Sequence, residues 1–218
     1  MTTPTKDRPT AADWLARAAA LAPRNEAFID GRFTPSASGQ TFADLTGRDG
    51  SRITDVAQGD VEDVERAVQA ARTSFDDRRW ADQSPADRKR VLLKLADLMR
   101  ANKEELALLE SLDVGKPIRD TMAVDVPSAA KTIQWYAETI DKVYGEVGPT
   151  GPDVLSLVTR EPIGVVAAIV PWNYPLIITA WKLGAALATG NSVVLKPASQ
   201  SPLTALRLAE LAAEAGLP

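Results

Sequence analysis

Cysteine and histidine are both absent from this 218-residue sequence. The chain therefore cannot supply a thiolate nucleophile, a Cys–His pair, a metal site built from those side chains, or a disulfide. No apolar run reaches the roughly 18 residues that a membrane span requires, so no membrane segment is expected. The first nine residues lack the apolar core of a signal peptide, which predicts a cytoplasmic protein.

Charge of one sign is not in large excess either, since 25 basic residues face 29 acidic ones. This balance offers no basic surface for nucleic acid, so that class of partner is not expected. The composition is 45% hydrophobic and 25% charged, which is typical of a globular protein. The length suits one large domain or two small ones.

Residues 1–9 are polar and contain proline, which predicts a disordered tail, and residues 10–144 form a mainly helical part. Three helices begin at recognisable caps, namely Thr10 or Asp13, then Asp60, then Ser84 followed by Pro85. Their predicted apolar faces are Trp14, Leu15, Ala18 and Leu21; Val61, Val64, Val68, Ala71 and Phe75; and Val91, Leu92, Leu95, Leu98 and Met99. Residues 27–33 and 51–57 are strand-like, around a turn-rich segment at 35–50.

The third helix is expected to continue through residues 103–112, and one more helix completes this part. Residues 103–112 carry the adjacent pair Glu104 and Glu105, which point apart on a helix and are interpreted as a solvated face rather than an acid–base pair. Gly115 ends that helix. Residues 127–144 form the last one, and its large apolar residues are assigned to the core rather than to a cofactor pocket: Ile133, Trp135, Tyr136, Ile140 and Val143.

The segment from residue 161 to residue 218 has the pattern of a strand, a helix and a strand. Gly164–Val170 is apolar without alternation, as expected of a strand buried on both faces, and Ser192–Leu195 is a shorter copy. Leu176–Thr189 between them is an apolar helix. A right-handed crossover places the ends of both strands at the same edge of the sheet, where α/β proteins bind ligands. The predicted fold class is therefore α/β, with a Rossmann-like parallel sheet, incomplete in this chain, and helices on both faces.

Several ordered motifs together resemble the N-terminal part of the aldehyde dehydrogenase superfamily. They are Ala27–Phe33, Asp113–Pro117, Arg160–Val165, Pro171–Pro175, Trp181–Gly184 and Lys196–Ser199. Within that superfamily, Lys94–Met99, Trp135–Glu138 and Lys142–Val147 look most like the γ-glutamyl-γ-aminobutyraldehyde dehydrogenases of putrescine breakdown. The family lacks the glycine-rich G-x-G-x-x-G fingerprint, so its absence here is neutral.

The resemblance implies a role for Asn173. It matches the asparagine whose side-chain amide helps to form the family's oxyanion hole, where a fixed N–H donor stabilises a developing alkoxide by roughly 3 kcal/mol. The alternative is that Asn173 only turns the chain after the strand. Taken alone, an asparagine favours the turn, but within these motifs the oxyanion role is favoured.

The resemblance also implies a cofactor site for NAD or NADP. Lys196 matches the lysine that reaches the adenosine ribose, although a solvated strand end is the alternative. Ile169, Pro171 and Trp172 would line the cleft, and a core role for Ile169 stays open. Many members carry a glutamate where this chain has Ser199, and the loss of that carboxylate removes repulsion against a 2′-phosphate. We therefore hypothesise that NADP is tolerated as well as NAD.

Residues 145–153 hold three glycines and two prolines before an alternating strand at 154–160. In the family, the region that corresponds to residues 145–160 is an arm that pairs subunits. The resemblance thus implies a homo-dimer or homo-tetramer acting on a small aldehyde. Oxidation in the family proceeds through a covalent thiohemiacetal, hydride transfer and thioester hydrolysis, and its cysteine and glutamate lie beyond residue 218, so this chain alone should be inactive. The alternative is a non-catalytic short form that binds cofactor or serves in assembly.

Overall fold

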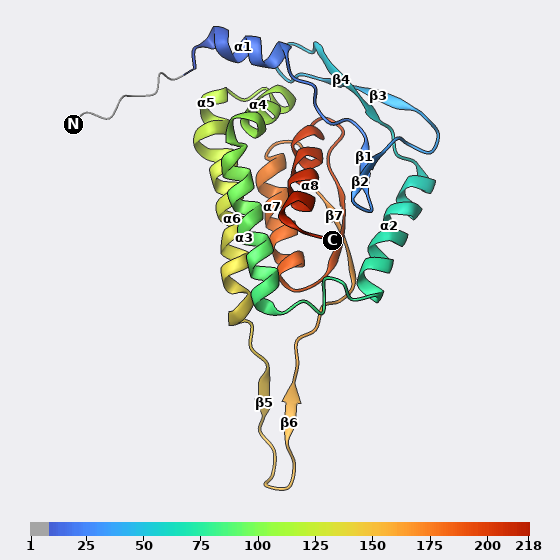
Figure 1. Ribbon diagram of the computed structural model, residues 1–218, viewed down its shortest axis with the longest axis vertical. Coiled ribbons are helices and arrows are strands. Elements are labelled where there is room, and N and C mark those ends of the chain that lie inside the picture. Colours follow the sequence, from blue (N-terminus) through green and yellow to red (C-terminus); the bar gives the residue numbers. More distant parts are fainter. Residues whose placement is uncertain (1–8) are drawn as a thin grey trace, which may run out of the picture.

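Four helices form the body of the protein in the computed structural model, which describes residues 9–218 (Figure 1). They are α3 (Pro85–Ala101), α6 (Val126–Thr139), α7 (Pro175–Ala188) and α8 (Leu203–Ala215). Their facing sides bury one continuous core, whose largest fully buried members include Leu92, Leu95, Met99, Ile133, Leu176, Leu208 and Leu211. The tail predicted for residues 1–9 lies, except for Pro9, outside the described residues.

The N-terminal region combines one helix with two hairpins. Helix α1 (Ala11–Ala19) begins as predicted, because the side chains and backbone of Thr10 and Asp13 form a capping box. Strands β1 (Ala27–Ile29) and β2 (Arg32–Thr34) divide the predicted strand 27–33 at Asp30 and Gly31, whose φ angles are 51° and 75°. Two such residues make the tight turn that suits a hairpin. Strand β4 (Arg52–Ala57) was expected, whereas its partner β3 (Thr41–Leu45) lies in the segment predicted as turns.

Helix α2 (Val61–Asp76) has the predicted cap but not the predicted buried face. Asp60 caps it, with Asp63 completing a capping box. However, Val61, Val64 and Val68 are 74%, 57% and 44% exposed. The helix contacts β7 and β8 through another side, and no element of the described chain covers the valines. The expectation that they are buried was therefore wrong.

The segment between α3 and α6 winds tightly. Ser84 caps α3 as predicted, accepting from the N–H of Asp87 at 3.1 Å. Helix α4 (Lys103–Val114) is a separate helix and not the predicted continuation of α3, because Asn102 between them leaves the helical conformation, at φ −98° and ψ 24°. Helix α4 ends at Gly115, whose φ is +75°. A short helix α5 (Ile118–Asp120) and a π-helical turn η1 (Thr121–Asp125) then lead into α6. Helix α6 is followed by the 3₁₀ turn η2 (Ile140–Lys142). In this region Ile133 and Ile140 are buried, as predicted. Trp135 and Val143 are more than half exposed, because no described element packs on their side, so the prediction that they belong to the core was wrong.

A β-hairpin stands away from the body, at the bottom of Figure 1. It consists of β5 (Glu146–Gly148) and β6 (Ser156–Val158), paired antiparallel, with Val147 opposite Leu157. Its apolar side chains are exposed, namely Val147, Val154, Leu155, Leu157 and Val158. An extended ribbon of this kind has no core of its own.

The crossover β7 (Val165–Ile169), α7 and β8 (Ser192–Lys196) follows the predicted order, and its two strands are parallel. In Figure 1, α7 and α2 lie on either side of β7, and both contact the strands. At the carboxyl end of β7, however, only one face is closed. Ala168 and Val170 are buried, whereas Ala167 and Ile169 are exposed, because α2 does not cover this end of the sheet. The expectation of a strand buried on both faces was therefore wrong.

Candidate functional site

The carboxyl ends of β7 and β8 lie next to each other because the strands are parallel. Ile169 pairs with Lys196, and the N–H of Val170 donates to the carbonyl of Lys196 at 3.2 Å. The segments that follow, 171–174 and 197–199, start from this shared edge. The residues predicted for the site from sequence are all carried by these two strand ends: Ile169, Pro171, Trp172, Asn173, Lys196 and Ser199.

All six of these residues are exposed, with Ile169 at 71% and Trp172 at 56%. A core role for Ile169 is thereby excluded in the described chain. The lysines that form ion pairs among the described residues are Lys89, Lys116 and Lys142, so the Lys196 ammonium is not neutralised by a carboxylate there. An open ammonium beside exposed apolar and aromatic side chains fits a nucleotide, which offers ribose hydroxyls and flat rings. The assigned roles themselves stay predictions.

Asn173 lies in the turn between β7 and α7, and its side chain is in solvent. Tyr174, the next residue, precedes α7 with φ −141° and ψ 60°, and no side chain of its own turn caps the helix. Instead, the Lys116 ammonium lies 3.5 Å from the centre of the Tyr174 ring, a cation–π contact. The same ammonium lies 2.9 Å from Oδ2 of Asp125, whose side chain is 3% exposed.

Two carboxylates on α4 cap the helices that flank the site. Oε1 of Glu110 accepts from the N–H of Leu176 at 3.4 Å, in the first turn of α7, and Oδ2 of Asp113 accepts from the N–H of Leu203 at 3.0 Å, at the start of α8. A carboxylate is favoured at a helix N-terminus, where unpaired N–H groups point outward. Glu110 and Asp113 thus replace the local caps that α7 and α8 lack.

Burial dominates the electrostatics of this carboxylate cluster. Loss of water, reinforced by the Asp125 carboxylate, raises the pKa of Glu110 to about 7. Burial likewise raises the pKa of Asp44, on β3, to about 6, and burial together with the neighbouring Asp44 raises the pKa of Asp113 well above its usual range. These groups hold protons more firmly than exposed carboxyls do.

Sequence reasoning missed Glu110 and Asp113, which are buried. It singled out Glu104, which is exposed, and Glu105, which is partly buried and pairs with Arg207, on the same helix. The sequence did contain a signal for these two buried carboxylates. Leu106 begins the apolar stripe of α4, and positions four and seven residues later carry Glu110 and Asp113. Charged residues on the apolar stripe of a helix indicate buried polar contacts.

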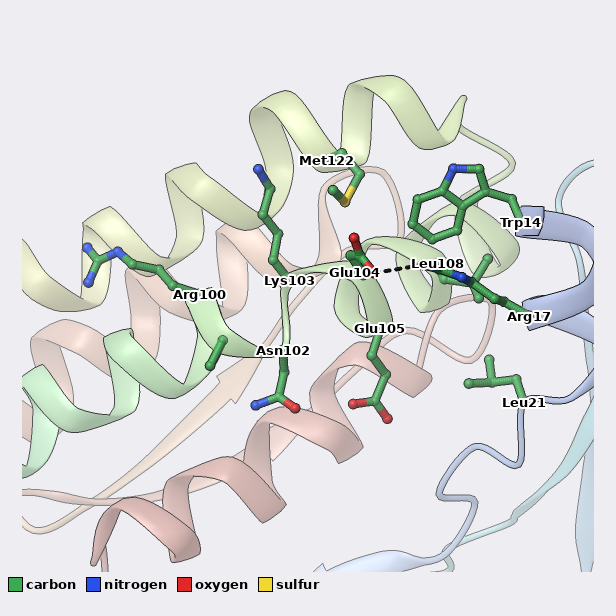
Figure 2. Close-up of a pocket in the computed structure, with 11 residues that line it drawn as sticks. Trp14, Arg17, Leu21, Arg100, Asn102, Lys103, Glu104, Glu105, Leu108 and Met122 are labelled. Carbon is green, nitrogen blue, oxygen red and sulfur yellow. Dashed lines mark hydrogen bonds and ion pairs between the residues drawn. The ribbon is translucent and has the colours of Figure 1, made fainter. Parts of the chain in front are cut away.

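A surface cavity of 670 Å³ lies elsewhere, between α1 and the junction of α3 with α4 (Figure 2). Arg17 pairs there with Glu104 at 2.7 Å and stacks on Trp14. None of the six predicted site residues lines it. Within residues 9–218, no group of three or more His, Cys, Asp or Glu side chains could hold a metal ion. No helix in the same range is long and apolar enough to cross a membrane.

Comparison with known proteins identifies the family of the chain. The model of the aldehyde dehydrogenase family matches residues 33–218. The NADP/NAD-dependent aldehyde dehydrogenase PuuC of Escherichia coli strain K12 is 55% identical over 205 residues, which are 94% of this chain and 41% of that protein. The chain thus spans less than half of the length of this relative.

Two solved structures have the same fold. The γ-glutamyl-γ-aminobutyraldehyde dehydrogenase of Burkholderia cenocepacia J2315 is 55% identical, with a TM-score of 0.94 over 95% of this chain and 42% of that one. An indole-3-acetaldehyde dehydrogenase in complex with NAD+ is 54% identical, with a TM-score of 0.95 over 97% of this chain and 43% of that one. The chain belongs to the aldehyde dehydrogenase family, and its fold is the α/β fold of that family.

Proposed function

We propose that the whole protein is an NAD(P)-dependent aldehyde dehydrogenase, which oxidises an aldehyde to a carboxylic acid. In this proposal, residues 161–218 begin its Rossmann-like nucleotide-binding sheet, and β7 and β8 are the first strands. The observation that carries the proposal is the shared edge at which Asn173 and Lys196 follow adjacent parallel strands. Ligands of open α/β sheets bind at such an edge.

Asn173 is proposed as the donor to the oxyanion. Attack of a nucleophile on an aldehyde turns its carbonyl oxygen into an alkoxide, and a side-chain amide can donate to it without a proton transfer. Support comes from the position of Asn173 directly after β7, at the ligand edge, with its side chain open to solvent. The 218 residues contain no cysteine, so they supply this donor and not the nucleophile.

The same edge is proposed as the cofactor site. Lys196 would donate to the adenosine ribose, and Ile169, Pro171 and Trp172 would offer an apolar wall. A bound nicotinamide cofactor supplies the hydride acceptor. Because Ser199 carries no charge, a 2′-phosphate meets no repulsion at that position, and we propose that NAD and NADP are both used. PuuC, by its name, uses both.

An aminoaldehyde such as γ-glutamyl-γ-aminobutyraldehyde, an intermediate of putrescine breakdown, is the proposed substrate, because a structure at 55% identity is named for that compound. We further propose that the protein acts as a homo-dimer or homo-tetramer joined by the β5–β6 hairpin. Its exposed apolar side chains support this, since an extended edge of this kind is a liability unless a partner covers it.

The experiment follows reduction of NAD and NADP by the purified whole protein with γ-glutamyl-γ-aminobutyraldehyde and with acetaldehyde. Asn173→Ala should lower kcat by about 10²-fold or more, whereas Gln69→Ala, an exposed amide on α2, should leave it unchanged. Absence of any aldehyde-dependent reduction would refute the proposal. Nucleotide binding without turnover would favour the alternative, a non-catalytic subunit for cofactor binding or assembly.

A further inference from the structure

The turn that carries Asn173 is held by residues from a distant part of the chain. Its own helix, α7, has no local side-chain cap, and Pro175 at the first helical position has no N–H to offer. The contacts that hold the helix side of this turn come from α4 and the segment after it. Glu110 accepts a hydrogen bond from the backbone N–H of Leu176, and the Lys116 ammonium lies against the ring of Tyr174.

Lys116 is itself fixed on three sides. The preceding Gly115 packs so closely on Gly47 that a Cβ there would lie 2.8 Å from the Gly47 carbonyl carbon. The carbonyl of Lys116 accepts from Oγ of Ser111 at 2.6 Å. Its ammonium is 2.9 Å from the buried Asp125 carboxylate. A buried ion pair of this kind holds its partners in one geometry.

Asp125 reaches Lys116 from the π-helical turn η1 (Thr121–Asp125), a rare geometry that is often found at functional sites. The turn is anchored by Thr121, whose hydroxyl donates to the buried carbonyl of Ala107 on α4 at 2.9 Å. The π turn therefore helps to fix the carboxylate that holds the lysine, and the lysine contacts the residue adjacent to Asn173.

We propose that Lys116 is a positioning residue for Asn173, acting through the ring of Tyr174, with Asp125 holding the lysine in place. The inference rests on the proposed function of Asn173 as the oxyanion donor. No hydrogen bond holds the exposed Asn173 side chain among the described residues, so the backbone of the turn sets the position from which its amide reaches the ligand edge. In this proposal, the contact between the Tyr174 ring and the Lys116 ammonium holds that backbone in place.

The test uses the whole protein and a charge-balanced variant, Lys116→Met with Asp125→Asn, which leaves neither charge buried alone. We expect kcat to fall about tenfold or more with an unchanged KM for NAD, because misplacement of a catalytic group slows chemistry rather than cofactor binding. The control is Lys89→Met with Asp141→Asn, a more exposed ion pair of 3.0 Å between α3 and η2 whose Asp141 also pairs with Lys142. It should leave kcat unchanged. Lys116→Arg, which can still pair with a carboxylate and stack on a ring, should recover most of the rate.

A double-mutant cycle separates positioning from general damage. In an Asn173→Ala background, loss of the Lys116–Asp125 pair should lower kcat little further, because the side chain that the pair positions is already absent. An additive loss, or a wild-type kcat in the Lys116–Asp125 variant, would overturn the inference. If that variant does not fold, Tyr174→Leu, which removes the ring without isolating a charge, replaces it in the cycle with the same expectations.

The two proposals fail differently. A wild-type kcat for Asn173→Ala would refute the oxyanion role and with it this inference. A loss in Asn173→Ala with none in the Lys116 or Tyr174 variants would refute only the positioning role.

Discussion

Glu110, in the middle of α4, accepts a hydrogen bond from the backbone N–H of Leu176 in the first turn of α7. The two residues are 66 positions apart in sequence, and both are fully buried. Three residues after Glu110, Asp113 does the same for α8. Helix α4 thus fixes the starting points of both helices that follow the strands of the candidate site.

The first prediction concerns the pH dependence of stability. The pKa of Glu110 is raised from its ordinary 4.5 to about 7, so between these values the folded chain keeps a proton that the unfolded chain releases. The contribution of Glu110 to the free energy of unfolding is therefore complete below pH 4.5 and decreases as the pH rises to about 7. Glu110→Gln, which keeps the acceptor oxygen, should remove this decrease, which amounts to about 3 kcal/mol.

Urea denaturation at several pH values from 4 to 8 measures this difference between the wild type and the variant. The contribution of Asp44 is common to both proteins, whereas the Glu110 carboxylate helps to raise the pKa of Asp113, so the measured difference also includes the change at Asp113. Parallel stability curves for the two proteins would show that Glu110 does not hold its proton.

The second prediction concerns cofactor choice. Ser199→Glu should lower kcat/KM for NADP by tenfold or more, because the new carboxylate faces a 2′-phosphate, and should leave kcat/KM for NAD within a fewfold of wild type. Ser199→Gln, of similar size without charge, is the control. Equal losses with both cofactors would contradict the placement of Ser199 beside the ribose.

The third prediction concerns the packing of α6 against α7. A Cβ on Gly184 would lie 2.4 Å from Cδ2 of Tyr136, so Gly184→Ala should destabilise the protein by about 1–3 kcal/mol in spite of alanine's higher helix propensity. Gly151, in the hairpin loop, has no atom within 4 Å of its Cβ position, so Gly151→Ala should change the unfolding free energy little. Thermal unfolding of both variants checks this, and equal effects would contradict it.

The fourth prediction concerns the hairpin. Val147→Glu combined with Leu157→Lys keeps a favourable cross-strand pair and removes apolar surface from the arm, so the whole protein should shift toward monomers in sedimentation velocity. Leu15→Lys, at a leucine of α1 that is 58% exposed, should leave the assembly unchanged. An unaltered oligomer in the hairpin variant would exclude the arm as the main subunit contact.

Features set by neighbouring residues could be read from the sequence. Thr10, Asp60 and Ser84 cap the helices that they were predicted to cap, because a cap needs only a side chain and the first turn that follows it. The parallel pairing of β7 with β8 was also predictable, since a strand, an apolar helix and a strand leave few ways of packing.

Only the tertiary structure decided which side chains lose contact with water. The valines of α2 have the spacing of a buried face and are exposed, while Glu110 and Asp113 are charged and buried. The contact of Lys116 with Tyr174 joins residues 58 positions apart, and no local pattern specifies it. The physical reason is the distance along the chain over which each interaction acts. Caps and periodicity act over one or two helical turns, whereas desolvation and ion pairing depend on elements that meet only when the whole chain has folded.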